Sequence, residues 1–115
     1  MRPLDLPLGF KYSTVYAGLR KQEKDDLALI VSGVPAAAAA VFTTNKVQAA
    51  PVKLSRANIR ASKGVCGAIL INAGNANCAT RTGDKVVANT TRALAKLLKL
   101  DPSQVLAAST GVIGV

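Results

Sequence analysis

Polar and apolar side chains alternate along the first part of the chain, as they do in β-strands. Aromatic and β-branched residues alternate with polar ones over Gly9–Leu19, so we predict a strand there. A charged turn over 20–26 and a second apolar run, Leu27–Ser32, follow. Gly33-Val34-Pro35 is expected to end this second strand, because Gly and Pro interrupt regular structure. We therefore predict an antiparallel hairpin with a long polar loop.

Five consecutive alanines, Ala36–Ala40, form the one low-complexity tract of the sequence. Alanine favours helix, but five residues do not hold a helix alone, and Val41–Thr43 are residues typical of strands. We predict a third strand over Ala36–Thr43, packed so closely that only methyl groups fit, with a helix as the alternative.

The middle of the chain predicts a short helix and then a buried strand. Ala50–Ile59 carries Pro51 in its first turn, where proline is tolerated, and should end near Ser62–Gly64. Val65–Ile71 is a continuous apolar run, which predicts a strand covered on both faces.

Gly83–Leu100 has apolar residues at helical spacing and gives the clearest helix prediction. Thr82 is expected to cap this helix, with Asp84 in its first turn. Asp101-Pro102 should end it and cap one further short turn. The short apolar segment Val105–Ser109 then leads to a terminal glycine turn. The order of strands and helices predicts a mixed α/β (α+β) fold, with a sheet covered by helices.

Charge and length narrow the class of protein. The 115 residues carry 15 Lys and Arg against 6 Asp and Glu, a net charge of +9. The basic residues are scattered, with no run of five or six like charges, so nucleic acid is not an expected partner. No apolar stretch suits a signal peptide or a membrane span. We expect a cytoplasmic protein with a solvated basic surface, forming one domain or a piece of a larger one.

The residue types present exclude several kinds of catalytic site. The sequence has no His, so Ser–His and Cys–His pairs are excluded, and no zinc pattern is present. Paired carboxylates and phosphate-binding glycine motifs are absent from it as well. Cys66 and Cys78 are expected to be reduced, packed thiols, with a disulfide as the alternative. The possibility that remains is catalysis by electrostatic stabilisation of negative charge, with the nucleophile supplied from elsewhere.

Three polar segments could border a site or simply form turns. Asn72–Asn77 follows the predicted buried strand and can be a ligand-lining loop or a rigid connection. The hydroxyls of Thr43-Thr44-Asn45 can face a site or satisfy turn amides. In the third segment, the Thr110 hydroxyl and the Gly111 N–H can stabilise an oxyanion, although small residues before Gly also form ordinary turns.

Four motifs occur in an order known from one family. They are Gly9-Phe10, Val41–Val52, Asn72–Asn77 and Ser109–Gly114. Over nearly its whole length the chain resembles the ornithine acetyltransferases of arginine biosynthesis, also called bifunctional glutamate N-acetyltransferase/amino-acid acetyltransferase. Each motif alone is weak, and the four together are specific.

The resemblance implies part of a four-layer αββα sandwich, similar to the fold of N-terminal-nucleophile hydrolases. In this family one precursor cleaves itself before a Thr into α and β chains, which assemble into a hetero-oligomer. The freed Thr takes the acetyl group of N-acetylornithine and passes it to glutamate, and some members also use acetyl-CoA. No further cofactor is implied. The family's oxyanion hole is a Thr-Gly pair, matched here by Thr110 and Gly111.

The resemblance also implies that residues 1–115 are a single partial domain, the N-terminal part of the α chain. The nucleophilic Thr has no counterpart here, so we expect the chain alone to be inactive, with the rest of the α chain and the β chain as its partners. After Asn77 the family typically has Ala-Cys-Thr-Gly, whereas this sequence has Cys78–Gly83, so this loop is rearranged or longer. Two alternatives stay open: a small basic binding module without catalysis, and a related self-processing aminopeptidase.

Overall fold

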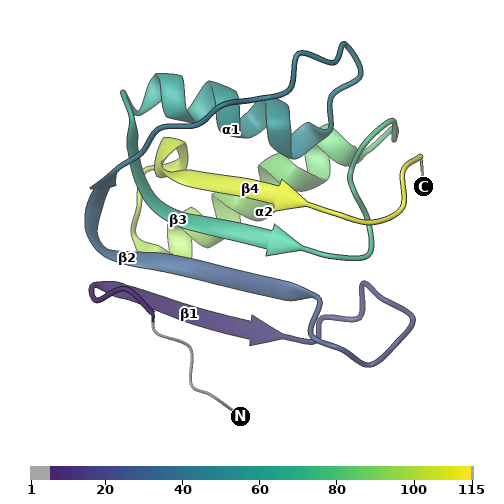
Figure 1. Cartoon of the computed structure of the whole chain (residues 1–115), viewed down its shortest axis with the longest axis horizontal. Coiled ribbons are helices and arrows are strands. Elements are labelled where there is room, and N and C mark those ends of the chain that lie inside the picture. The colour runs from purple at the N-terminus through teal and green to yellow at the C-terminus, as the bar shows by residue number, and fades with distance from the viewer. Residues whose placement is uncertain (1–5, 115) are drawn as a thin grey trace.

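The computed structural model describes residues 6–114 as a four-stranded sheet with one α-helix along an edge strand and a second across one face (Figure 1). The strands are β1 (Phe10–Val15), β2 (Leu27–Ala37), β3 (Val65–Asn72) and β4 (Val105–Ser109), and they lie in the order β1-β2-β3-β4. The helices are α1 (Ala50–Ala61), α2 (Gly83–Leu98) and the short 3-10 helix η1 (Pro102–Gln104). The mixed α/β class predicted from the sequence is confirmed.

The predicted hairpin is confirmed. Strands β1 and β2 are antiparallel, with Phe10 paired to Ser32 and Val15 to Leu27. Strand β3 pairs antiparallel with β2 and parallel with β4. The parallel pair requires a crossover connection, and α2 supplies it.

The predicted end of the second strand is wrong. Strand β2 continues through Gly33-Val34-Pro35 to Ala37, with a shift of register between Val31 and Ala36. Proline cannot donate a hydrogen bond to a ladder, and the irregular stretch accommodates it there.

The predicted third strand over Ala36–Thr43 is also wrong. Only Ala36 and Ala37 belong to a strand, where they pair with Cys66 and Val65. Strand β3 begins at Val65, so the chain beyond Ala37 has no partner strand left. Residues 38–49 therefore leave the sheet and form neither helix nor strand. Alanines 37, 39 and 40 are exposed, so the predicted close packing of the alanine methyl groups against neighbouring elements is wrong too.

Helix α1 covers the free edge of β4. The Ser55 hydroxyl donates to the Ala107 carbonyl at 2.9 Å and accepts from the Ala107 N–H at 3.0 Å. The Asn58 amide donates to the Val105 carbonyl at 2.8 Å. These side chains replace a neighbouring strand, so an edge that would otherwise invite pairing is closed. The side of α1 that lies on β4 is therefore partly polar.

The core lies between the sheet and α2. Ala68 of β3, Ala95 of α2 and Val105 of β4 are buried, and Leu and Val side chains from β2 and α2 pack around them. Both predicted helices are confirmed, α2 ending two residues before the predicted end.

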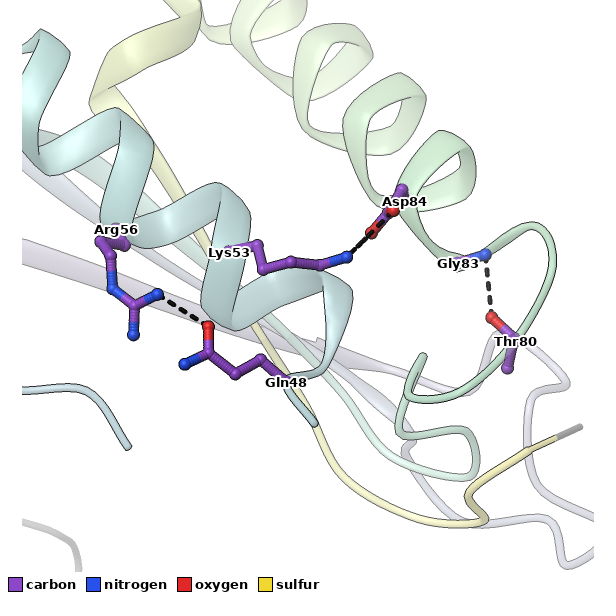
Figure 2. Close-up of polar contacts among 6 residues, drawn as sticks. All are labelled: Gln48, Lys53, Arg56, Thr80, Gly83 and Asp84. Carbon is purple, nitrogen blue, oxygen red and sulfur yellow. Dashed lines mark hydrogen bonds and ion pairs between the residues drawn. The ribbon is translucent and has the colours of Figure 1, made fainter. Parts of the chain in front are cut away.

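The ends of the helices differ in one detail from the prediction. The Thr82 side chain makes no capping hydrogen bond. The Thr80 hydroxyl accepts from the Gly83 N–H at 2.9 Å instead (Figure 2). Asp84 lies in the first turn of α2 as predicted, and Asp101 caps η1 by accepting from the Ser103 N–H at 3.0 Å.

The opposite face of the sheet is open. Because side chains alternate along a strand, Phe10, Tyr12, Ile30, Ile69 and Ile71 point away from the face that carries Ala68. All five are at least partly exposed, and no helix or further strand among residues 6–114 packs on them. The expectation that β3 is covered on both faces is therefore not met within the described residues.

Candidate functional site

The carboxyl ends of the parallel strands β3 and β4 lie side by side (Figure 1). Asn72 ends β3, Ser109 ends β4, and the two are paired in the sheet. The Ser109 hydroxyl donates to Asn72 Oδ1, and Asn77 Nδ2 donates to Ser109 Oγ at 3.0 Å. Side chains thus join two of the predicted segments at the carboxyl ends of the parallel strands, where ligands commonly bind.

Side-chain hydrogen bonds brace the Asn72–Asn77 loop. Asn72 Nδ2 donates to the Asn75 carbonyl at 2.8 Å, and Asn75 Oδ1 accepts from the Asn77 N–H at 2.8 Å. Asn77 has a φ of 51°, a conformation that asparagine tolerates better than most residues. These bonds hold the loop in shape, as the structural interpretation predicts, and a ligand-lining role for it stays a prediction.

Thr110 and Gly111 follow β4 and run beside this loop. The Thr110 N–H donates to the Asn72 carbonyl at 2.9 Å, and the Val112 N–H donates to the Gly74 carbonyl at 3.4 Å. Both Thr110 and Gly111 are exposed. Within residues 6–114, neither the Thr110 hydroxyl nor the Gly111 N–H has a hydrogen-bond partner. Two donors are therefore available at adjacent positions.

Gly111 occupies a position that only glycine fits. Its φ is +132°, and a Cβ there would lie 2.5 Å from the carbonyl carbon of Gly74 and 2.7 Å from the Asn75 nitrogen. The next layer is equally tight, since a Cβ on Gly74 would lie 2.7 Å from the Leu19 carbonyl oxygen. The main chains of Leu19, Gly74 and Gly111 are stacked at the minimum spacing, and this fixes the position of the Gly111 N–H.

A cavity of about 350 Å³ lies on the helix side of the sheet. This volume falls in the range of small-molecule sites. Its walls are mostly apolar, from Leu27, Leu70 and Val87, and Asn72 and Ser109 contribute polar groups. Among residues 6–114 no charged side chain lines it, and neither Thr110 nor Gly111 does. Ser109, the residue directly before Thr110, does line it.

Thr43-Thr44-Asn45 forms a turn, as one of the two interpretations predicted. The Thr43 hydroxyl accepts from the Asn45 N–H at 3.1 Å. Arg56 of α1 holds this segment, and its guanidinium donates to Gln48 Oε1 at 2.7 Å (Figure 2). The guanidinium also donates to the Thr43 carbonyl at 3.3 Å and lies 5.2 Å from the centre of the Phe42 ring.

An ion pair joins the first turns of the two helices. Lys53 Nζ of α1 lies 2.9 Å from Asp84 Oδ1 of α2 (Figure 2). Both side chains are more than half exposed, so solvent screens the pair and it adds little to stability.

Asp26 is a residue that sequence reasoning missed. It was expected on a charged surface turn, but it is only 3% exposed. Its carboxylate accepts from the N–H groups of Ala17 at 2.7 Å, Leu19 at 2.6 Å and Arg20 at 3.0 Å. Burial disfavours the charged form, but these backbone donors outweigh it and hold the pKa of Asp26 below its usual range. No signal in the sequence separates Asp26 from its charged neighbours.

The cysteines and acids support no metal site within the described part of the chain. Cys66 and Cys78 are free thiols as predicted, and burial raises the pKa of Cys66. Over residues 6–114 there is no group of three metal-ligating side chains. In the same range no helix has the length and apolar character needed to cross a bilayer.

Comparison with known proteins identifies one family. The model of the ArgJ family matches residues 11–115. The chain is 50% identical over 111 residues to the arginine biosynthesis bifunctional protein ArgJ of Nitratidesulfovibrio vulgaris, covering 94% of this chain and 28% of that protein. It is 52% identical over 108 residues to the chloroplastic ArgJ of Populus trichocarpa, covering 92% of this chain and 22% of that protein. The chain thus spans about a quarter of the length of these relatives.

Two solved structures share the fold. ArgJ from Bacillus halodurans superimposes with a TM-score of 0.87 at 37% identity, covering 94% of this chain and 56% of that one. Ornithine acetyltransferase from Mycobacterium tuberculosis, solved with ornithine, superimposes with a TM-score of 0.86 at 34% identity, covering 95% of this chain and 59% of that one.

Proposed function

Because this chain belongs to the ArgJ family of arginine biosynthesis, we propose that it is the N-terminal part of an acyltransferase that moves an acetyl group from N-acetylornithine to glutamate. The relatives' names and the matched Mycobacterium tuberculosis structure support the arginine-biosynthesis role and the ornithine acetyltransferase class. Acetyl-CoA is proposed as a second acetyl donor, and the cytoplasm as the location.

The proposed reaction has two acyl transfers. The hydroxyl of a Thr outside residues 1–115 attacks the acetyl carbonyl carbon of N-acetylornithine, and the carbonyl oxygen becomes an oxyanion. The C–N bond then breaks, ornithine leaves with a proton on its amine, and an acetyl ester remains on the Thr. The amine of glutamate attacks this ester, releases N-acetylglutamate and restores the Thr hydroxyl.

In this proposal the Thr110 hydroxyl and the Gly111 N–H stabilise the oxyanion in both steps. One observation carries the assignment. The two donors are exposed, adjacent and unpaired among the described residues, and the Gly111 main chain is held at contact distance by Gly74. Donors fixed before the reaction need no reorganisation when negative charge develops.

The remaining catalytic groups come from partners, on this account. Residues 1–115 would form a partial domain, completed by the rest of the α chain and by a β chain in a hetero-oligomer. The open face of the sheet supports this proposal, since the apolar side chains of Phe10, Tyr12 and Ile69 have no cover in the described part of the chain. Membership of the ArgJ family argues against the binding module and the self-processing aminopeptidase.

A hybrid enzyme tests the proposal. It carries residues 11–115 of this chain in place of the matching segment of the Nitratidesulfovibrio vulgaris relative. We expect the hybrid to transfer labelled acetyl from N-acetylornithine to glutamate, and residues 1–115 alone to transfer none. A folded hybrid without transfer, or transfer by the chain alone, contradicts the proposal.

A further inference from the structure

We propose that Asp26 is a positioning residue for the oxyanion donors, acting through the stacked main chains of Leu19, Gly74 and Gly111. This inference rests on the proposed function, because it assumes that Thr110 and Gly111 bind the oxyanion. Asp26 lies in the β1–β2 loop, far from Gly111 in sequence, and this loop and the segment after β4 lie at the same end of the sheet (Figure 1).

Asp26 hydrogen-bonds to the main chain of the loop before it and of two neighbouring segments. Its carboxylate accepts three N–H groups, from Ala17, Leu19 and Arg20, so the loop before it is folded around one side chain. Its own N–H donates to the Val15 carbonyl at 3.0 Å, and its carbonyl accepts from the Ala73 N–H at 2.8 Å. One buried residue thus ties β1, the loop 16–26 and the segment after β3 together.

The path from Asp26 to Gly111 runs through main-chain atoms of Leu19 and Gly74. Leu19 donates its N–H to Asp26 Oδ2 at 2.6 Å, and its carbonyl oxygen lies where a Cβ on Gly74 would come within 2.7 Å. Gly74 lies in the same way against Gly111. If the Leu19 main chain shifts, the Gly74 main chain that lies against it can shift as well. Gly111, which lies against Gly74, then loses its fixed position. Close-packed layers of this kind transmit small shifts without absorbing them.

The chemistry of Asp26 suits this role better than that of a neutral side chain. Among residues 6–114 no cation pairs with Asp26, so its charge is balanced by the backbone N–H groups. Charge-assisted hydrogen bonds of this kind are shorter and stronger than neutral ones. An Asn at this position has the same shape, but one of its two terminal groups donates and would face N–H donors.

The test uses the hybrid enzyme with Asp26→Asn and, as the matched control, Asp25→Asn. Asp25 is the exposed neighbour, and within residues 6–114 its side chain accepts a hydrogen bond from the Thr14 hydroxyl alone. Turnover is divided by the amount of acetyl-enzyme formed in the burst phase, so that unfolded protein does not count. We expect Asp26→Asn to lower kcat about tenfold to hundredfold, the effect of a small misplacement of catalytic groups, with KM for N-acetylornithine unchanged within twofold. Asp25→Asn should leave both constants unchanged within twofold.

A double-mutant cycle separates positioning from general destabilisation. If Asp26 acts on the donors, the combined loss of kcat in Asp26→Asn with Thr110→Ala is smaller than the product of the single losses, by about threefold or more. Gly74→Ala, which disturbs the middle layer, should show the same coupling. Equal losses in both backgrounds, a change confined to KM, or an unchanged kcat in Asp26→Asn overturns the inference. A Thr110→Ala hybrid with normal kcat contradicts the proposed function itself. The single variant therefore distinguishes failure of the proposed function from failure of the Asp26 inference.

Discussion

Gly111 lies so close to Gly74 that a Cβ on Gly111 would be 2.5 Å from the carbonyl carbon of Gly74. Both residues also have a positive φ, +132° and +102°. The two motifs that contain them, Asn72–Asn77 and Ser109–Gly114, are therefore parts of one main-chain arrangement. This contact explains why each motif needs its glycine.

Gly74→Ala is expected to destabilise the hybrid far more than Gly18→Ala. Gly18 also has a positive φ, +85°, but a Cβ there meets nothing within 4 Å. Gly18→Ala should cost about 1 kcal/mol for the left-handed backbone, and Gly74→Ala about 1–3 kcal/mol more for overpacking. Urea unfolding of the two variants measures the difference. Equal costs would show that space around Gly74 is not limiting.

Ser55→Ala is expected to lower the free energy of unfolding by about 1–3 kcal/mol, because the N–H and the carbonyl of Ala107 would lose their partner. The matched control is Thr90→Ala, which removes an exposed hydroxyl that donates to the Val86 carbonyl of its own helix. That change should stay within about 0.5 kcal/mol. Similar values for the two variants would mean that α1 does not close the edge of β4.

The stabilisation that Asp26 provides should disappear in acid. Its pKa is lowered in the folded state, so its contribution is fully present above the unfolded pKa of about 4 and is lost as the pH falls through the folded pKa. The urea midpoint of the hybrid should exceed that of its Asp26→Asn variant at pH 7, and the gap should narrow as the pH is lowered from about 5 towards 2. A gap that is constant or grows in acid contradicts this assignment.

Residues 1–115 alone are expected to self-associate. The apolar side chains of Phe10, Tyr12, Ile30, Ile69 and Ile71 share a face that no described element covers, and exposed apolar faces of this kind drive association. Sedimentation at several protein concentrations should give a mass that rises with concentration. Since the contact is apolar, added salt should not reverse it, and Tyr12→Lys should weaken it. A stable monomer at all concentrations would argue against an open face.

The fold could be predicted where the pattern is local. The helical spacing over Gly83–Leu100 and the apolar run over Val65–Ile71 depend on the residues themselves. The predictions were wrong where pairing with a strand distant in the sequence determines the structure. Pro35 stays in β2 because the ladder with β3 is irregular beside it, and the chain beyond Ala37 leaves the sheet because β3 has already begun.

The candidate site shows the same division. Thr110 and Gly111 could be named from a motif, because that motif is contiguous in the sequence. Asp26 and Ser55 could not be named, because each acts by hydrogen bonding to backbone groups. Those of Asp26 belong to a loop folded around it, and those of Ser55 are far along the chain. Asp26 is one acid among charged neighbours, and the bonds of Ser55 to Ala107 span 52 positions. Polar residues that satisfy main-chain groups leave no periodicity.

The most direct measurement of the central proposal is the kcat of the hybrid enzyme with Thr110→Ala, compared with the hybrid itself and with Thr90→Ala. Thr90 presents an exposed hydroxyl on α2. If the Thr110 hydroxyl stabilises the oxyanion, Thr110→Ala lowers kcat about 10²- to 10³-fold, the cost of one such donor, while Thr90→Ala stays within twofold. A loss of less than threefold in Thr110→Ala would contradict the account.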